Sequence, residues 1–251
     1  MGDGDVNGKG LARRTGAATL QGARKALTTA SDAIVDNAPR IPVRDLATLR
    51  GQFPGLGPHE LADKLVAGAV KGTSTVGAGV GAAAALPAPP AMPVELAGEV
   101  FGVALIEIKL IAELCEVYGQ RAPGSKAERA YAYLTMWAAD GGAKASRSRG
   151  IGTVIGGEVA KQLRQQVLKR LIRNLPVLAP FMIGAAAGAV MNRRDTRRLA
   201  ARVRAQLAQG QVPWDALPYG ARAELDESPG TDAKKRKGLF GDRGAPRALE
   251  G

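Results

Sequence analysis

Glycine residues recur four positions apart at five places in the Gly/Ala-rich expected helices of this chain of 251 residues. Residues at this spacing lie on one face of a helix, and two glycines there let a second helix approach closely. A chain with 33 glycines produces single pairs by chance, but five pairs spread over four expected helices favour close helix packing over coincidence. The pairs are Gly68/Gly72, Gly77/Gly81, Gly98/Gly102, Gly152/Gly156 and Gly184/Gly188.

The remaining composition also indicates helices. Aromatic residues make up 4% of the chain, and the β-branched and aromatic runs that are typical of strands are nearly absent. Prolines interrupt the helical pattern in "LPAPPAMP" (86–93), because proline removes an amide donor and fixes φ. We therefore predict an all-α fold, a helical bundle with closely packed Gly/Ala-rich helices and a Pro-rich elbow. The expected helices cover about 17–36, 43–53, 60–85, 94–118, 125–139, 153–174 and 181–209.

Shifts in composition divide the chain into four parts. Residues 1–16 are polar and lack helical periodicity, so we predict that they are disordered. We expect an N-terminal helical extension at 17–57, the main helical domain at 58–208, and a disordered charged tail at 209–251.

Two uncharged runs approach the length of a membrane span, 72–94 with 23 residues and 174–192 with 19. Both contain prolines and consist mostly of Ala and Gly, which insert into lipid less favourably than Leu or Ile. Basic residues lie on both sides of the second run, so a single span would carry one cluster across the membrane, against the positive-inside tendency. This excludes a simple span and leaves a shallow hairpin, an interfacial element or a buried helix.

Positive charge is concentrated in one stretch of the chain. Residues 144–208 carry 14 basic and 2 acidic residues, a surplus of 12 that equals the net charge of the whole protein. The same arginines could bind anionic lipid or an acidic partner, bind nucleic acid non-specifically, or form a solvated helix face. The scarcity of aromatic residues and the lack of a nucleic-acid motif count against nucleic acid. The candidate binding residues are Arg170, Arg173, Arg193, Arg194, Arg197, Arg198 and Arg202.

The expected helix at 94–118 places one carboxylate on its apolar side. Glu107 lies there among Leu, Val and Ile residues, and a buried carboxylate needs a partner. We predict a buried ion pair of Glu107 with Arg164 or Arg173; a catalytic or transport carboxylate is the lesser alternative. The other charged residues of this helix share a stripe that is expected to face water: Glu95, Glu99, Lys109, Glu113 and Glu116.

Few residues could support catalysis. His59 is the only histidine and Cys115 the only cysteine, which excludes an internal disulfide and a Cys/His zinc site. The segment "GAGVG" (77–81) follows no expected strand and precedes no Gly-Lys-Ser/Thr, so it is not a phosphate-binding loop. We expect no enzymatic activity and no cofactor, and no small-molecule substrate is evident.

Three segments resemble proteins of the EcsC family: "LPAPPAMPVELAGEV", "IKLIAELCEVYG" and "PFMIGAAAGAVMNRRDTRRLAARVR". The resemblance covers about residues 60–208, and it rests on the order of these segments rather than on a catalytic signature. It implies an α-helical bacterial protein near the membrane, in a family named after a component encoded beside an ABC exporter. The long N-terminal helices and the charged tail depart from the family's pattern.

These features together predict a non-enzymatic protein of EcsC type on the cytoplasmic side of the bacterial membrane, either peripheral or monotopic. Its basic region at 144–208 would bind an anionic membrane surface or a membrane protein. The alternative is a cytoplasmic helical bundle that binds nucleic acid through the same arginines.

Overall fold

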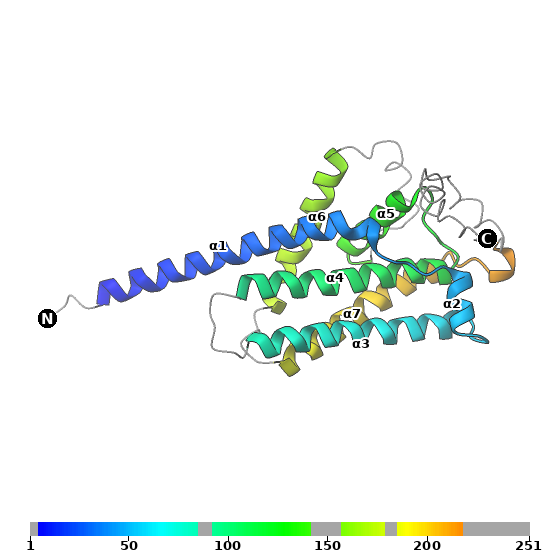
Figure 1. The fold of residues 1–251 in the computed structure, drawn as a ribbon, viewed down its shortest axis with the longest axis horizontal. Coiled ribbons are helices and arrows are strands. Elements are labelled where there is room, and N and C mark those ends of the chain that lie inside the picture. The colour runs from blue at the N-terminus through cyan, green and yellow to red at the C-terminus, as the bar shows by residue number, and fades with distance from the viewer. Residues whose placement is uncertain (1–4, 85–91, 142–156, 179–184, 218–251) are drawn as a thin grey trace, which may run out of the picture. The chain divides into compact units, whose positions relative to one another are not determined.

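The structure is a computed structural model that describes residues 5–84, 92–141, 157–178 and 185–217. Seven α-helices and no strand occur in these ranges, which confirms the predicted all-α helical bundle (Figure 1). The helices are α1 (Asp5–Asn37), α2 (Leu46–Gln52), α3 (Pro58–Ala84), α4 (Met92–Val117), α5 (Lys126–Ala138), α6 (Gly157–Leu178) and α7 (Ala185–Ala208), with 3-10 turns η1 (Ala38–Arg40) and η5 (Trp214–Ala216).

The chain divides into two units, Met1–Pro213 and Trp214–Gly251. The second unit is described only at 214–217, where η5 is closed by a hydrogen bond of 3.1 Å from the Leu217 amide to the Trp214 carbonyl. Most of the tail predicted at 209–251 therefore lies outside the described residues. So does the predicted elbow at 86–93, apart from its last two residues, which begin α4.

The N-terminal part of the chain differs from the prediction. Helix α1 begins at Asp5, so residues 5–16, which were predicted to be disordered, are helical. Extending an existing helix needs no new nucleus, and polar residues can therefore continue it without an apolar face of their own. The later part of α1 buries Leu27 and Ile34, and α1 packs on α4 and α6. The predicted extension thus belongs to the same compact unit as the main domain.

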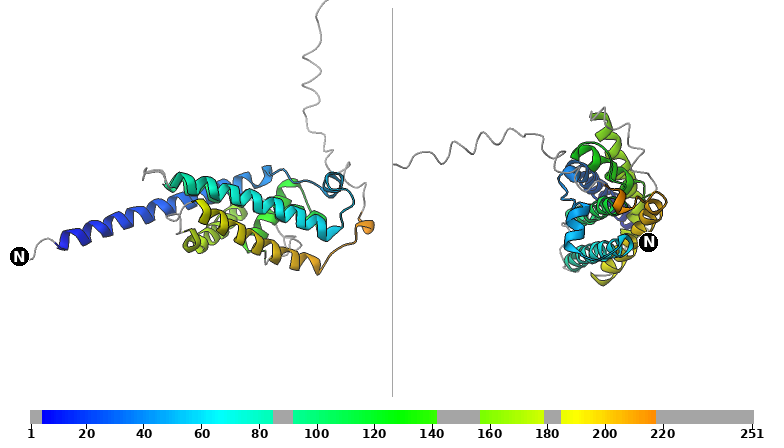
Figure 2. Two further views of the ribbon diagram at one scale, coloured as in Figure 1. Left: turned by 90° about the horizontal axis from the view of Figure 1, so that it is seen from below. Right: turned by 90° about the vertical axis from the view of Figure 1, so that its right-hand side faces the viewer.

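Helix α4 lies at the centre of the first unit, since α1, α3, α5 and α7 all pack against it (Figure 2). The expected water-facing stripe is therefore wrong: Glu99, Glu113 and Glu116 are buried, and only Lys109 keeps partial exposure. Amphipathic patterning identifies a solvent-facing side only when one side of the helix has no packing partner, and α4 is enclosed by other helices. The side chain of Glu95 lies outside the described residues.

Helix α4 ends as the sequence predicts. Gly119 adopts a φ of 68°, in the left-handed region that favours glycine. The Gln120 amide donates to the Cys115 carbonyl at 2.8 Å and the Gly119 amide to the Glu116 carbonyl at 3.1 Å. This is the Schellman arrangement, which satisfies the last carbonyls of the helix.

Helices α3 and α7 lie side by side and approach most closely at Gly77 and Gly188 (Figures 1 and 2). A Cβ atom on Gly77 would lie 2.9 Å from the Gly188 carbonyl oxygen, and one on Gly188 would lie 3.0 Å from the Gly77 carbonyl oxygen. The predicted close packing is confirmed at this contact. Gly68 and Gly98, in contrast, have nothing within 4 Å of a Cβ position. The pair Gly152/Gly156 and Gly184 lie outside the described residues.

Candidate functional site

Polar contacts fix the inner face of α7. The Asn192 amide nitrogen donates to the Glu99 Oε1 at 2.9 Å and to the Thr73 carbonyl at 3.3 Å. One turn later, the Thr196 hydroxyl donates to the Glu107 Oε1 at 2.9 Å and lies 3.0 Å from the Thr73 hydroxyl. Because buried polar groups need these partners, α7 cannot rotate about its axis without losing them.

Glu107 is 4% exposed, so its predicted burial is confirmed. Its Oε2 accepts a hydrogen bond of 2.8 Å from the Trp137 indole nitrogen and lies 3.5 Å from the Arg170 Nη2. Burial raises the pKa of Glu107, while Arg170 and the hydrogen bonds from Trp137 and Thr196 oppose that shift. Both carboxylate oxygens are thus already engaged within the bundle.

The two predicted partners of Glu107 are wrong. Arg164 contacts Asp32 at 3.2 Å and Asp36 at 2.9 Å, both on α1, and Arg173 is exposed. The partner Arg170 lies between them on α6, six residues after Arg164 and three before Arg173. The predicted arginines, chosen from the basic region, do lie on the helix that supplies the partner, but the buried face of α6 contains Arg170.

Arg170 is therefore also wrongly placed in the predicted lipid-binding set. It is 5% exposed, and its Nη1 donates to the Trp137 carbonyl and to the Asp140 Oδ1, each at 2.5 Å. Its guanidinium carbon lies 4.3 Å from the centroid of the Trp137 ring, which is a cation–π contact. Arg170 joins α4, α5 and α6 and does not face a surface partner.

Asp140 connects this cluster to α7. It follows α5 with a φ of 59°, and its Oδ1 lies 3.1 Å from the Arg202 Nη2. The Arg202 Nε also donates to the Asp140 carbonyl at 2.9 Å. Arg202, predicted to bind lipid, is exposed, but its contacts with Asp140 hold the end of α5 against α7.

The outer face of α7 carries four exposed arginines, and we call them the basic face: Arg193, Arg194, Arg197 and Arg198. Arg198 lies 3.8 Å from the half-buried Asp195, a weak contact of neighbouring turns. The other three form no ion pair with any residue in the described part of the chain. The structure thus brings together four of the predicted binding residues, whereas Arg173 lies on α6.

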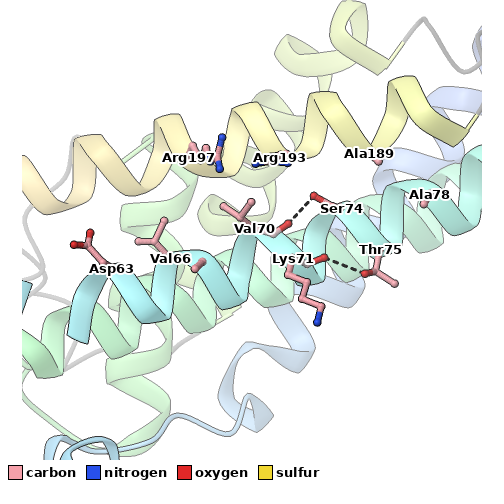
Figure 3. A pocket seen from close by; sticks show the side chains of 11 residues that line it. Asp63, Val66, Val70, Lys71, Ser74, Thr75, Ala78, Ala189, Arg193 and Arg197 are labelled. Carbon is pink, nitrogen blue, oxygen red and sulfur yellow. Dashed lines mark hydrogen bonds between the residues drawn. The ribbon is translucent and has the colours of Figure 1, made fainter. Parts of the chain in front are cut away.

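A groove with a volume of about 780 Å³ lies between α3 and α7 (Figure 3). Its α3 wall includes Val66, Ala67 and Val70, and its α7 wall includes Arg193 and Arg197. Half of the basic face therefore borders an apolar depression, an arrangement that sequence periodicity did not reveal because it depends on which two helices are neighbours.

Sequence reasoning missed the polar residues that position α7, although a signal was present. Asn192, Thr196, Leu199 and Val203 follow the spacing of a single helix face, opposite the arginines. Polar residues that share a helix face with buried apolar residues indicate an internal hydrogen-bonded contact. Their partners Thr73 and Trp137 carry no comparable signal, because they lie on other helices.

The lone cysteine and histidine are both accounted for by packing. Cys115 is buried, and burial raises the pKa of its thiol. The His59 ring meets the Tyr118 ring edge-on, with centroids 5.9 Å apart. Throughout the described ranges, no three His, Cys, Asp or Glu side chains gather as metal ligands would.

Within those ranges, no helix combines the length and the hydropathy that crossing a membrane requires. No protein-family model, curated protein or solved structure matches the chain.

Proposed function

We propose that this chain is a non-enzymatic, membrane-associated helical protein of EcsC type, peripheral to the cytoplasmic side of a bacterial membrane. Its basic face would bind anionic lipid. The observation that carries the proposal is the set of exposed arginines on α7, on a helix whose opposite side is fixed by Asn192 and Thr196.

Uncharged side chains continue the midline of the basic face beyond both of its ends, which favours a lipid surface. At 3.6 residues per turn, Val190 and Ala201 fall between Arg193 and Arg197 on one edge and Arg194 and Arg198 on the other. Val190 is 64% exposed. Arginine stems can lie along apolar material while their guanidinium groups reach lipid phosphates.

The expected free energy of binding supports weak and reversible association with the membrane. A basic residue near an anionic leaflet contributes about 1 kcal/mol, so four contribute about 4 kcal/mol, equivalent to a Kd of about 1 mM. Peripheral proteins usually add a second, apolar signal to this attraction. Here Val190 and the groove between α3 and α7 supply apolar surface beside the charges.

An acidic segment of a membrane protein could meet the same face by the same attraction. Nucleic acid fits it less well, because α7 contains no aromatic side chain on which a base could stack. Any nucleic-acid binding would rest on phosphate contacts alone and would weaken steeply with salt.

Flotation with vesicles tests the proposal. The full chain should float with vesicles rich in phosphatidylglycerol at about 0.15 M salt and stay behind with phosphatidylcholine vesicles, because only the former attract the basic face. Gel shifts with duplex DNA at the same salt serve as the comparison. Absence of flotation with both vesicle types would contradict the proposal, and DNA binding under those conditions would favour the nucleic-acid alternative.

A further inference from the structure

We infer that the groove between α3 and α7 binds a single-chain anionic lipid with a phosphate headgroup. The inference rests on the proposed function, because a membrane would supply such a ligand. It is carried by an apolar floor next to two arginines that have no acidic partner among the described residues.

The floor of the groove offers almost nothing to a polar ligand. Val66, Ala67 and Val70 line it on α3, together with two hydroxyl residues (Figure 3). The Ser74 hydroxyl donates to the Val70 carbonyl at 2.7 Å, and the Thr75 hydroxyl donates to the Lys71 carbonyl at 3.0 Å. Since both hydroxyl protons are used within α3, the floor suits a hydrocarbon chain.

The positive charge lies on the α7 wall. Arg193 and Arg197 line the groove from successive turns of α7, opposite the α3 side chains (Figure 3). The one carboxylate of the lining, Asp63, already contacts the Arg204 Nη1 at 2.5 Å, so it does not compete for them. Lys71 extends away from α7 (Figure 3), which leaves the two arginines as the anion-binding groups.

These two features select the class of ligand. Guanidinium groups bind phosphate through paired, charge-assisted hydrogen bonds, so a phosphate monoester fits better than a zwitterionic headgroup. Each methylene that the floor removes from water should strengthen binding by about fourfold. The volume of about 780 Å³ lies within the usual range for small-molecule sites.

Calorimetry with lysophosphatidate below its micellar concentration tests the inference on the full chain. We expect saturable binding of one molecule, binding of lysophosphatidylcholine with the same chain to be weaker by about tenfold or more, and no detectable binding of inorganic phosphate. Replacement of the groove arginines (Arg193→Gln with Arg197→Gln) should weaken lysophosphatidate binding by about tenfold or more. The matched control, Arg24→Gln with Lys25→Gln, removes the same charge from exposed positions outside both the groove and the basic face and should bind like the wild type.

A second variant blocks the floor without changing charge. Ala67 lines the groove and is exposed, so Ala67→Trp should fill the groove, leave the core intact and abolish binding of both lysolipids. The inference would be overturned if lysophosphatidate bound with equal affinity to the wild type, to Arg193→Gln with Arg197→Gln, and to Ala67→Trp. Binding of a polyglutamate peptide in place of any lysolipid would also overturn it and would indicate a protein partner.

The vesicle experiment separates the two proposals. Flotation with anionic vesicles but no lysolipid binding would overturn the groove inference and leave the proposed function standing. Lysolipid binding without flotation would support the groove and contradict membrane association through the basic face.

Discussion

Four carboxylates of α4 are buried, and their partners determine how each affects stability. Glu107 contacts Arg170, Trp137 and Thr196, and Glu113 contacts Arg44 and Lys109. Glu116 lies 3.1 Å from the Arg121 Nε. Glu99 is the least satisfied: its Oε1 accepts from Asn192, whereas its buried Oε2 has no hydrogen-bond partner among the described residues.

Removal of Glu107 should leave a buried arginine with one carboxylate fewer. Glu107→Ala leaves Arg170 with only the partly exposed Asp140 as an acidic partner and should destabilise the protein by about 3–5 kcal/mol, as for other broken buried pairs. Glu107→Gln keeps the shape and an acceptor and should cost less. Thermal and urea unfolding of both variants measure this. Changes of only about 0.5 kcal/mol, typical of surface positions, would contradict the buried pair.

Glu99 should make the protein less stable as pH rises. Burial raises its pKa above the ordinary value of 4.5, and the hydrogen bond from Asn192 only partly opposes this. A raised pKa gives stability that is fully present below pH 4.5 and is lost as pH rises through the folded-state pKa. Glu99→Gln lacks this loss and should be more stable than the wild type by about 1 kcal/mol near pH 7, with a smaller difference near pH 4. Urea unfolding at both pH values measures it, and a difference that does not change with pH would refute the assignment.

Glu113 should show the opposite dependence. Burial acts to raise its pKa, but the hydrogen bonds and charges of Arg44 and Lys109 outweigh it, and the pKa falls below 4.5. The Arg44 Nε and Nη2 donate to the two carboxylate oxygens at 2.8 and 2.7 Å. The resulting stability is present above pH 4.5 and is lost as pH falls through the lowered pKa.

Glu113→Gln should therefore cost about 1–2 kcal/mol near neutral pH, since Arg44 and Lys109 are partly solvated. The cost should shrink in acid, and the same urea titrations detect it. A cost that persists unchanged well below pH 4.5 would show that the ion pair is not its source.

At this scale the sequence predicts that Glu107 is buried but not which arginine it meets. Helical periodicity places a residue on a face of its own helix, whereas the relative register of α4 and α6 is set by packing. An error of one turn was therefore enough to select Arg173 instead of Arg170.

At the scale of helices, the contact between Gly77 and Gly188 should tolerate no added atom. A methyl group from Gly77→Ala would lie 2.6 Å from the Asn192 amide nitrogen and 2.9 Å from the Gly188 carbonyl oxygen. We expect destabilisation by about 1–3 kcal/mol, the usual cost of overpacking. Gly68→Ala is the matched control: nothing lies within 4 Å of its Cβ position, and alanine there should stabilise α3 by about 0.5–1 kcal/mol. Similar unfolding midpoints for the two variants would contradict close packing of α3 against α7.

Most helices were predictable because their ends carry strong local signals. Gly119 ends α4, and Ser125 with Glu128 forms a capping box that begins α5. Whether the charged side chains of α4 face water or the interior was not predictable, because the number of helices around α4 is a property of the tertiary fold. The start of α1 at Asp5 also lacked a sequence signal, since its first residues continue a helix that is stabilised further along.

At the scale of the first unit, helix packing determines which side of α7 faces outward, and the proposed function depends on that orientation. The close contact at Gly188 and the hydrogen bonds of Asn192 and Thr196 hold one side of α7 in the bundle. The basic face follows from this as the opposite side. The sequence predicts that these arginines share a helix, whereas the groove beside them arises only when α3 and α7 are neighbours.

Flotation of charge-matched variants tests the central claim most directly. One variant replaces the basic face by glutamine at all four positions; the other replaces four exposed basic residues of α1, α3 and α5, namely Arg24, Lys25, Lys64 and Lys126. Both lose the same net charge, so a difference between them reports the location of the binding surface. If α7 binds anionic lipid, the first variant should stay behind with phosphatidylglycerol vesicles at about 0.15 M salt while the second floats like the wild type. Equal flotation of the two variants would contradict a membrane surface on α7.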